Sequence, residues 1–289
     1  RRNVIRTLAR VLQLAVYPLR LIEKSPLPSG FVPKGGSTKA LQWLYPDEDR
    51  KLLGDRRIPL CYRLLWGFLV REGMREAEAY SLTWADIDFT HGVVRLDQNK
   101  TNDPRSWALD ASVCEGLTLL RKSLRADEPA TSRIMVDEFG RPLIAERLPN
   151  LLRRHLQMIG LKESRPELFE TTAARRRIVV HDLRGSFVTV ALANGRSESW
   201  VSARTGHRSS QMIARYRRTA SSVQEVRAGD WGSLVVCIPE LGALRASERQ
   251  SDAGSTAAAS ESGRAPSGNG EGGASTVSTG PPTPDPANR

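Results

Sequence analysis

HDLRGSFVTVALANGRSESWVSARTGHRSSQMIARY, residues 181–216, gathers four side chains suited to phosphate chemistry into one short run. They are His181, Arg184, His207 and Tyr216. Two imidazoles, a guanidinium and a phenol can together bind a phosphate, move protons and attack phosphorus. The same stretch contains the start and stop signals of three helices, so it bears on the fold as well as on the chemistry.

The first helix predicted in this stretch begins at about His181. Because His181 and Arg184 are three residues apart, both side chains project from one face of the first turn. The backbone N–H groups at a helix N-terminus also favour an anion, so a phosphate would fit there. Gly195 is expected to end this helix.

Two further helices are predicted after Gly195. Ser197 is expected to cap the second, and the TGHR turn then presents His207 at a corner between helices. Ser209 or Ser210 can cap a last, short helix that carries Tyr216. A phenol with a pKa of about 10 is a weak nucleophile at neutral pH, so cations and a proton acceptor are needed nearby.

Upstream of this stretch the patterns are mainly helical. Pro46 followed by three acidic residues is typical of a helix start. Apolar spacing predicts a second helix from Ile58 to Glu72, which stops at Gly73. Between Trp84 and Leu109, short β-like pieces separated by turn residues predict a small antiparallel sheet, with Lys100 in a turn.

Helical patterns resume at Ala111 and include residues 148–160, whereas residues 173–180 (AARRRIVV) are basic and irregular. After the tyrosine, residues 234–241 (LVVCIPEL) form a strand-like apolar run, expected to dock either on a neighbouring copy or on its own domain. The predicted fold class is α+β, mainly α-helical, with a small antiparallel sheet that carries the lysine turn.

The chain is strongly basic, with a formal net charge of +11 over 289 residues. Such a surplus favours a polyanionic partner such as nucleic acid or an anionic membrane face. Residues 246–289 contain five acidic residues and three arginines, so the basic surface belongs to the preceding domain. These residues are rich in Ser, Gly, Ala and Pro and nearly free of large apolar side chains, which predicts a disordered tail.

Cysteine usage and the N-terminal segment indicate the compartment. Cys61, Cys114 and Cys237 are far apart and form no C-x-x-C pair, so neither a disulfide framework nor a zinc site is suggested. We therefore expect a cytoplasmic, nucleoid-associated protein. Residues 1–24 lack the apolar core of a signal peptide and predict an amphipathic helix closed by Pro18. No stretch is apolar enough to span a membrane.

Together with upstream residues, the 181–216 stretch resembles the catalytic domain of the tyrosine recombinases, the phage integrase family. The resemblance covers roughly residues 41–218, and all six positions of the family's motif are filled in order. They are Arg75 in GMREAEAYSL, Lys100 in NKTNDPR, His181 and Arg184 in HDLR, His207 in the Gly-His turn, and Tyr216. The interval of 23 residues from Arg184 to His207 is also the usual one. Six positions in order are far more specific than any single motif.

The resemblance implies that Tyr216 attacks a scissile DNA phosphate, which forms a 3′-phosphotyrosyl bond and releases a 5′-hydroxyl. A second strand's 5′-hydroxyl would reverse the step. Arg75 and Arg184 would hold the non-bridging oxygens, because forked donors match a phosphate. Glu78 would be the usual acidic neighbour of Arg75.

The resemblance also assigns the proton transfers. Lys100 would protonate the departing 5′-oxygen, His181 would help move the tyrosine proton, and His207 would donate to a phosphate oxygen. Asp182 is expected to support the site. No metal or nucleotide cofactor is implied, because one phosphodiester is exchanged for another.

The implied partner is double-stranded DNA, on which the chain would act as a homotetramer and away from which it would be a monomer. No membrane partner is expected. The arginines expected to contact DNA are Arg105, Arg175, Arg176, Arg177, Arg208 and Arg215. Residues 1–36 resemble the last helix of a truncated N-terminal core-binding domain plus a linker, residues 37–245 the catalytic domain, and residues 246–289 form the tail.

Two positions depart from the family pattern. Gly185 stands where a histidine or arginine commonly follows the second arginine. Arg204 and Thr205 stand where two apolar residues usually precede the Gly-His turn. Neither change removes a catalytic group, but Arg204 places a charge near a packing position, which predicts a rearranged corner or a weakened domain.

The leading hypothesis is a site-specific recombinase, integrase or transposase of a mobile element. One alternative is a relative that binds DNA without cutting it, and the filled catalytic positions argue against this. A second is a nicking and rejoining enzyme similar to type IB topoisomerases, which shares the tyrosine chemistry but acts alone. The Gly-His turn and the apolar segment after the tyrosine favour the recombinase.

Overall fold

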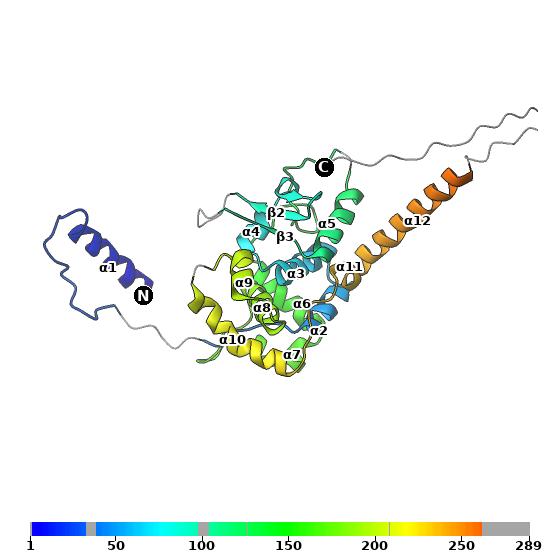
Figure 1. The fold of residues 1–289 in the computed structure, drawn as a ribbon. Coiled ribbons are helices and arrows are strands. Elements are labelled where there is room, and N and C mark those ends of the chain that lie inside the picture. Colours follow the sequence, from blue (N-terminus) through cyan, green and yellow to red (C-terminus); the bar gives the residue numbers. More distant parts are fainter. Residues whose placement is uncertain (1, 33–38, 98–103, 126, 208, 262–289) are drawn as a thin grey trace, which may run out of the picture. The chain divides into compact units, whose positions relative to one another are not determined.

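The computed structural model describes residues 2–32, 39–97, 104–125, 127–207 and 209–261 (Figure 1). In chain order the helices are α1 Arg2–Val16, α2 Pro46–Gly54, α3 Leu60–Glu72, α4 Glu76–Ser81, α5 Ala111–Ser123, α6 Leu148–Met158, α7 Leu161–Ser164, α8 His181–Ala193, α9 Glu198–Thr205, α10 Ser210–Glu225, α11 Leu234–Cys237 and α12 Pro239–Glu261. The strands are β1 Ile87–Asp88, β2 Val93–Leu96 and β3 Arg105–Ala108. The predicted class, mainly helical with a small sheet, is confirmed.

Helix α3 lies in the core and packs against α2, α4 and α8. Its residues from Tyr62 to Glu72 are all buried, as expected of a helix that is largely apolar on every face. The helix ends at Gly73, whose φ of 61° is in the left-handed region that glycine adopts without strain. A Cβ at Gly73 would lie 2.2 Å from Cδ1 of Phe187, so this glycine also lets α8 approach closely.

The three strands form one antiparallel sheet in the order β1, β2, β3. Val94 pairs with Trp107, and Leu96 pairs with Arg105. The predicted small sheet is therefore confirmed. Lys100 belongs to the connection between β2 and β3 and lies outside the described residues. Trp107 and the Arg105 side chain are both buried, so they share the inner face of β3, as alternate residues of a strand do.

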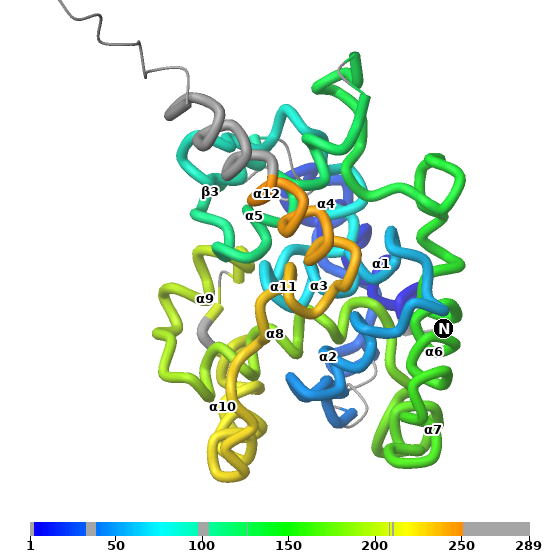
Figure 2. The backbone as a smooth tube through the Cα atoms, turned by 90° about the vertical axis from the view of Figure 1, so that its right-hand side faces the viewer, coloured from blue at the N-terminus to red at the C-terminus, as the bar shows by residue number. Residues whose placement is uncertain are grey.

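Helices α8, α9 and α10 pack together on one side of the domain, below the sheet in Figure 1 and again side by side in Figure 2. Ser197 accepts a hydrogen bond from the Trp200 N–H, and Ser209 accepts one from the Gln211 N–H, as the predicted caps require. Helix α10 has 16 residues, so the expectation of a short helix around Tyr216 is wrong.

Residues 234–241 are helical, and the predicted strand-like run is wrong. They form α11 and the first turn of α12, and α11 packs on α5 and α2 of the same domain. Leu234, Val235, Ile238 and Leu241 are fully buried, at the spacing of a helix face. A short apolar run shows no clear period, so its sequence does not distinguish a strand from a buried helix.

The structure divides into two units, Arg1–Arg245 and Ala246–Arg289. Helix α12 continues from the first unit to Glu261, so the disorder predicted from residue 246 does not begin there. The alanines at 257–259 are strong helix formers, which accounts for the difference. The rest of the tail lies outside the described residues. Among the described residues, no helix is long and apolar enough to cross a membrane.

Candidate active site

Arg184 lies at the centre of the candidate site. It projects from the first turn of α8 and is 3% exposed. Its guanidinium donates to the carbonyl oxygens of Gly73, at 3.0 Å, and Thr205, at 2.5 Å, so it joins the end of α3 to the end of α9. Burial, reinforced by the charge of Arg75, lowers the pKa of Arg184 to about 10, which still leaves it protonated at neutral pH.

His207 follows the corner between α9 and α10. Gly206 ends α9 with a φ of 65°, and the Thr205 hydroxyl donates to the Val201 carbonyl oxygen at 2.7 Å. That hydroxyl lies 2.9 Å from Nδ1 of His207, and having used its own hydrogen it can only accept there. Nδ1 therefore carries the proton, while Nε2 faces Arg184 at 3.3 Å. Burial and the nearby arginines lower the pKa of His207 to about 4.

Tyr216 lies on the inner face of α10 and is 8% exposed. Its ring belongs to an apolar cluster of α8, α9 and α10, and its centroid is 6.5 Å from that of His207. A Cβ at Gly185 would lie 3.2 Å from Cε1 of Tyr216, so the tyrosine occupies the space that a side chain at this departure from the family pattern would need. Burial raises the pKa of Tyr216, and the charges of Arg184 and Arg215 oppose the rise.

Arg75 joins this group from the other half of the domain. It precedes α4, and its Nη1 donates to Glu78 at 2.8 Å while its Nη2 donates to the Gly206 carbonyl oxygen at 3.1 Å. Glu78 also accepts the Arg75 backbone N–H and a hydrogen bond from Arg105. The predicted partnership of Arg75 with Glu78 is therefore present, and it brings Arg75 to the residue before His207.

His181 and Asp182 occupy the start of α8. The His181 side chain is exposed, and partial desolvation together with the charges of Arg184 and Arg176 lowers its pKa. It is therefore neutral at pH 7 and can accept a proton. Asp182 is buried and accepts hydrogen bonds from the Val179 N–H and the Arg176 guanidinium, so it supports the segment that leads into α8.

The arginines predicted to contact DNA differ in exposure. Arg175, Arg177 and Arg215 are exposed, and Arg176 is half-buried in its pair with Asp182. The Arg105 side chain is only 8% exposed and pairs with Glu78, so in this structure it is not a surface residue. Arg208, like Lys100, lies outside the described residues.

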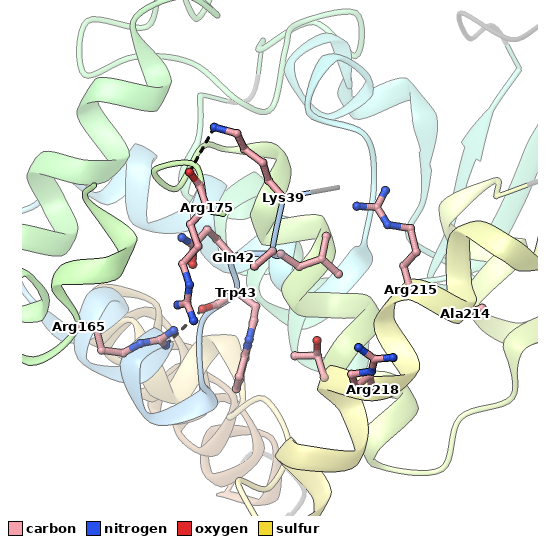
Figure 3. A pocket seen from close by; sticks show the side chains of 11 residues that line it. Lys39, Gln42, Trp43, Arg165, Arg175, Ala214, Arg215 and Arg218 are labelled. Atoms are coloured by element: carbon pink, nitrogen blue, oxygen red, sulfur yellow. Dashed lines mark hydrogen bonds between the residues drawn. The ribbon is translucent and has the colours of Figure 1, made fainter. Parts of the chain in front are cut away.

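A basic cavity of about 520 Å³ opens beside α10 (Figure 3). None of the described residues that line it is acidic, and five are basic: Lys39, Arg165, Arg175, Arg215 and Arg218. Arg165 is already paired with Glu48 and Glu167. Sequence reasoning missed Lys39, Arg165 and Arg218. The run of arginines beside Tyr216 could have indicated Arg218, but no spacing relates the other two to α10.

Arg204 has a specific partner in the fold. Its guanidinium lies 4.2 Å from the ring centroid of Trp200 and 3.5 Å from the carboxylate of Glu72, which is fully buried. Glu72 also accepts hydrogen bonds from the Trp107 indole and the Asp110 N–H. The charge of Arg204 at this packing position is therefore paired with a buried carboxylate and stacked on an indole ring.

Comparison with known proteins places this geometry in a family. The sequence model of the phage integrase family matches residues 42–222, and the chain belongs to this family. The tyrosine recombinase XerC of Lactobacillus leichmannii is 27% identical over 180 residues, which are 60% of this chain and 56% of the relative. XerC of Lactobacillus delbrueckii subsp. bulgaricus matches to the same extent. The chain thus spans little more than half the length of these curated relatives.

Solved structures share the fold. The XerA recombinase superposes with a TM-score of 0.50 and 17% identity, covering 76% of each chain. The Tn1549 transposon integrase in complex with circular intermediate DNA has a TM-score of 0.54 and 19% identity, over 74% of this chain and 73% of that one. A lambda integrase dimer bound to a core site has a TM-score of 0.53 and 17% identity, over 75% of this chain and 58% of that one. At these identities the likeness concerns the fold alone.

Proposed function

We propose that this protein cleaves and rejoins DNA strands at specific sites through a 3′-phosphotyrosyl intermediate, as a recombinase, integrase or transposase. One observation carries the proposal: Arg75, Arg184 and His207 converge at the Gly206 corner. The ring of Tyr216 lies beside His207, packed in the apolar cluster of α8, α9 and α10. Membership of the phage integrase family and the likeness to XerC support it.

The arginines supply the main electrostatic contribution. Arg75 and Arg184 present forked donors that match the two non-bridging oxygens of a phosphodiester. Their positions are fixed before substrate arrives, because both are hydrogen-bonded to backbone carbonyls. Preorganised donors of this kind stabilise the charge that develops in the transition state, and removal of one typically costs ~10² to 10³ in rate.

The histidines and a lysine would move the protons. Neutral His181 would accept the Tyr216 proton, and Lys100 would protonate the departing 5′-oxygen. His207 presents only an acceptor, Nε2, toward Arg184 in the free protein. An incoming phosphate adds negative charge, which raises the pKa of His207, so that Nε2 would gain a proton and donate to a phosphate oxygen.

The partner we propose is double-stranded DNA. The basic cavity beside α10 lies next to Tyr216 in sequence and in space, and its arginines Arg175, Arg215 and Arg218 are exposed. We assign it, together with Arg176 and Arg177, to the DNA backbone on either side of the scissile phosphate. Arg208, which lies outside the described residues, completes this set, whereas the buried Arg105 is not assigned to the DNA backbone. Binding through such contacts should weaken steeply with salt.

We further propose that the protein is a monomer without DNA and a homotetramer when two duplexes exchange strands, working on the nucleoid in the cytoplasm. Strand exchange distinguishes it from a nicking and rejoining enzyme of the type IB topoisomerase kind. The chain's own packing of α11 and α12 accords with a monomer in the free state, since Leu234 and Leu241 are already covered.

The test is trapping of the covalent intermediate. The protein is incubated with nicked suicide duplexes tiled across the DNA that flanks its own coding sequence, and denaturant-resistant adducts are resolved on gels. We expect an adduct with the unmodified chain and none with Tyr216→Phe. Two-duplex crossover products would then separate a recombinase from a topoisomerase. No adduct with any duplex, under conditions in which the protein binds DNA, would leave the non-cutting alternative.

A further inference from the structure

A third guanidinium, that of Arg105, lies inside the candidate site. Its Nη2 donates to Glu78 at 2.5 Å, and Glu78 in turn holds both the side chain and the backbone N–H of Arg75. Its Nη1 packs on Gly206, where a Cβ would be only 2.7 Å away. Arg105 therefore contacts the carboxylate and the corner that together fix Arg75.

Arg105 is an unusual residue for this setting. Its side chain is 8% exposed, and its Nε and Nη1 are buried without a hydrogen-bond partner among the described residues. Burying an unpaired donor and a charge costs free energy, so stability alone does not account for an arginine here. Its buried donors also cannot reach a DNA backbone at the surface.

The charge balance of the cluster points to an anion. Arg75 and Arg105 share Glu78, and among the described residues no carboxylate is hydrogen-bonded to Arg184. Among the described residues, Glu78 is therefore the one carboxylate bonded to this group of three guanidiniums. A phosphate that approaches the transition state gathers negative charge, which Arg75 and Arg184 stabilise best when they are held in place.

Arg105 also lies at the base of the β2–β3 hairpin. It is the first residue of β3, paired with Leu96 across the hairpin whose connection contains Lys100. The same guanidinium therefore ties the base of this hairpin to Glu78 and, through it, to Arg75.

We propose that Arg105 is a positioning residue for strand cleavage, which acts through Glu78 to hold Arg75 at the scissile phosphate. The inference rests on the proposed function. It differs from a role in DNA binding, because Arg105 acts from the interior and not at the DNA surface.

The test separates cleavage from binding. Single-turnover adduct formation is measured at saturating suicide duplex, and the Kd is measured in a Tyr216→Phe background. For Arg105→Met we expect the rate to fall by about 10- to 100-fold, with a Kd within about twofold of the parent because the side chain does not meet DNA. Arg105→Lys keeps the charge but not the forked guanidinium, so its rate should lie between those of the parent and Arg105→Met.

The matched control is Arg95→Met. Arg95 lies on the adjacent strand β2, where its side chain is 59% exposed and pairs with Asp88. We expect this variant to cleave at the parental rate. Thermal unfolding of every variant is recorded, and Glu78 keeps Arg75 as its counter-ion in Arg105→Met, so the fold should persist.

Two further measurements exclude a merely structural role. In an Arg75→Met background, the additional Arg105→Met change should cost less than threefold, because a residue that acts through Arg75 has nothing left to position. On a duplex with a methylphosphonate at the scissile position, a methyl group replaces one charged oxygen, so Arg75 contributes less to the cleavage rate. The rate should therefore fall less in Arg105→Met on this duplex than on the natural one.

Different results would overturn the positioning role and the proposed function. A parental rate in both Arg105 variants, a weakened Kd with an unchanged saturated rate, or an equal loss in the Arg75→Met background overturns the positioning role alone. A loss that is as large on the methylphosphonate duplex as on the natural one also overturns it. Absence of any adduct with the parental chain overturns the proposed function and this inference together.

Discussion

Arg71, in the last turn of α3, and Arg75, just before α4, lie four residues apart. Both are buried or half-buried beside a carboxylate, yet their hydrogen bonding differs. Arg71 is 1% exposed at its side chain and pairs with Asp49 at 2.8 Å. Its other donors reach the carbonyl oxygens of Gly67 and Gly232, so every nitrogen of its guanidinium is hydrogen-bonded. Its charge is matched by one carboxylate.

The Arg75 group is the opposite case. Glu78 pairs with two guanidiniums, those of Arg75 and Arg105, while nitrogens of Arg105 and Arg184 are buried without hydrogen-bond partners among the described residues. The Arg75 side chain is 26% exposed, so the group opens to solvent at one point. Saturated donors mark the arginine that holds the fold, and unsaturated donors with surplus charge mark those that await an anion.

The largest expected effect comes from Arg184→Met. The rate of adduct formation should fall by ~10² to 10³, because a fixed donor at the phosphate is lost. The free energy of unfolding should change little, since the lost hydrogen bonds to Gly73 and Thr205 are offset by removal of an unneutralised buried charge. Suicide-duplex kinetics and urea unfolding measure the two quantities. An unfolded variant would contradict the contrast with Arg71.

Arg71→Met should show the reverse pattern. Removal of this cation leaves Asp49 buried without its counter-ion, which costs about 3–5 kcal/mol in free energy of unfolding. The fraction that remains folded at low temperature should form adduct at the parental rate. The double variant Arg71→Met, Asp49→Leu should recover most of the stability, because an apolar pair replaces the ion pair. A specific loss of cleavage in folded Arg71→Met would count against a purely structural role.

A smaller effect is expected where Tyr216 packs on α8. In Gly185→Ala the new Cβ would lie 3.2 Å from the tyrosine ring, which must shift by a few tenths of an ångström. We expect cleavage to slow by about tenfold, while the helix gains ~0.5–1 kcal/mol of intrinsic stability. The matched control is Gly116→Ala, where a Cβ meets Leu241 at the same 3.2 Å but far from the tyrosine. Equal cleavage rates in the two variants would refute this packing role.

The smallest effect is a change in pH dependence. The lowered pKa of His181 means that it is neutral above pH 6.5 and becomes protonated only in more acidic solution. The cleavage rate at subsaturating duplex, which reports the free protein, should therefore be flat near neutrality and fall on the acid side, with its midpoint below the ordinary histidine pKa of about 6.5. His181→Gln should be slower and should lose this acid limb. An unchanged acid limb in that variant would show that a group other than His181 accepts the tyrosine proton.

Local signals in the sequence predicted most elements of the catalytic domain. The acidic start of α2, the end of α3 at Gly73, the small sheet and the Ser197 cap all depend on neighbouring residues, and all are present. The helices at residues 234–237 and 239–261 were not predicted, because neither segment contains a periodic pattern long enough to fix its secondary structure.

The site was predictable only in part. Order, spacing and the family resemblance predicted Arg75, His181, Arg184, His207 and Tyr216. The structure brings Arg75, Arg184 and His207 together at Gly206. The partners that position them were not visible, since Glu72 meets Arg204 and Gly206 meets Arg75 over more than 130 residues. The burial of Arg105 was within reach, because it lies two residues from Trp107 in a strand and so faces the same side.

The most direct test of a phosphate-binding, tyrosine-dependent site is to identify the residue that carries DNA. The adduct formed on a suicide duplex is digested with nuclease and protease, and the modified peptide is sequenced by mass spectrometry. We predict one nucleotide joined through its 3′-phosphate to the hydroxyl of Tyr216. Attachment to any other residue, or through a 5′-phosphate, would contradict the proposed chemistry.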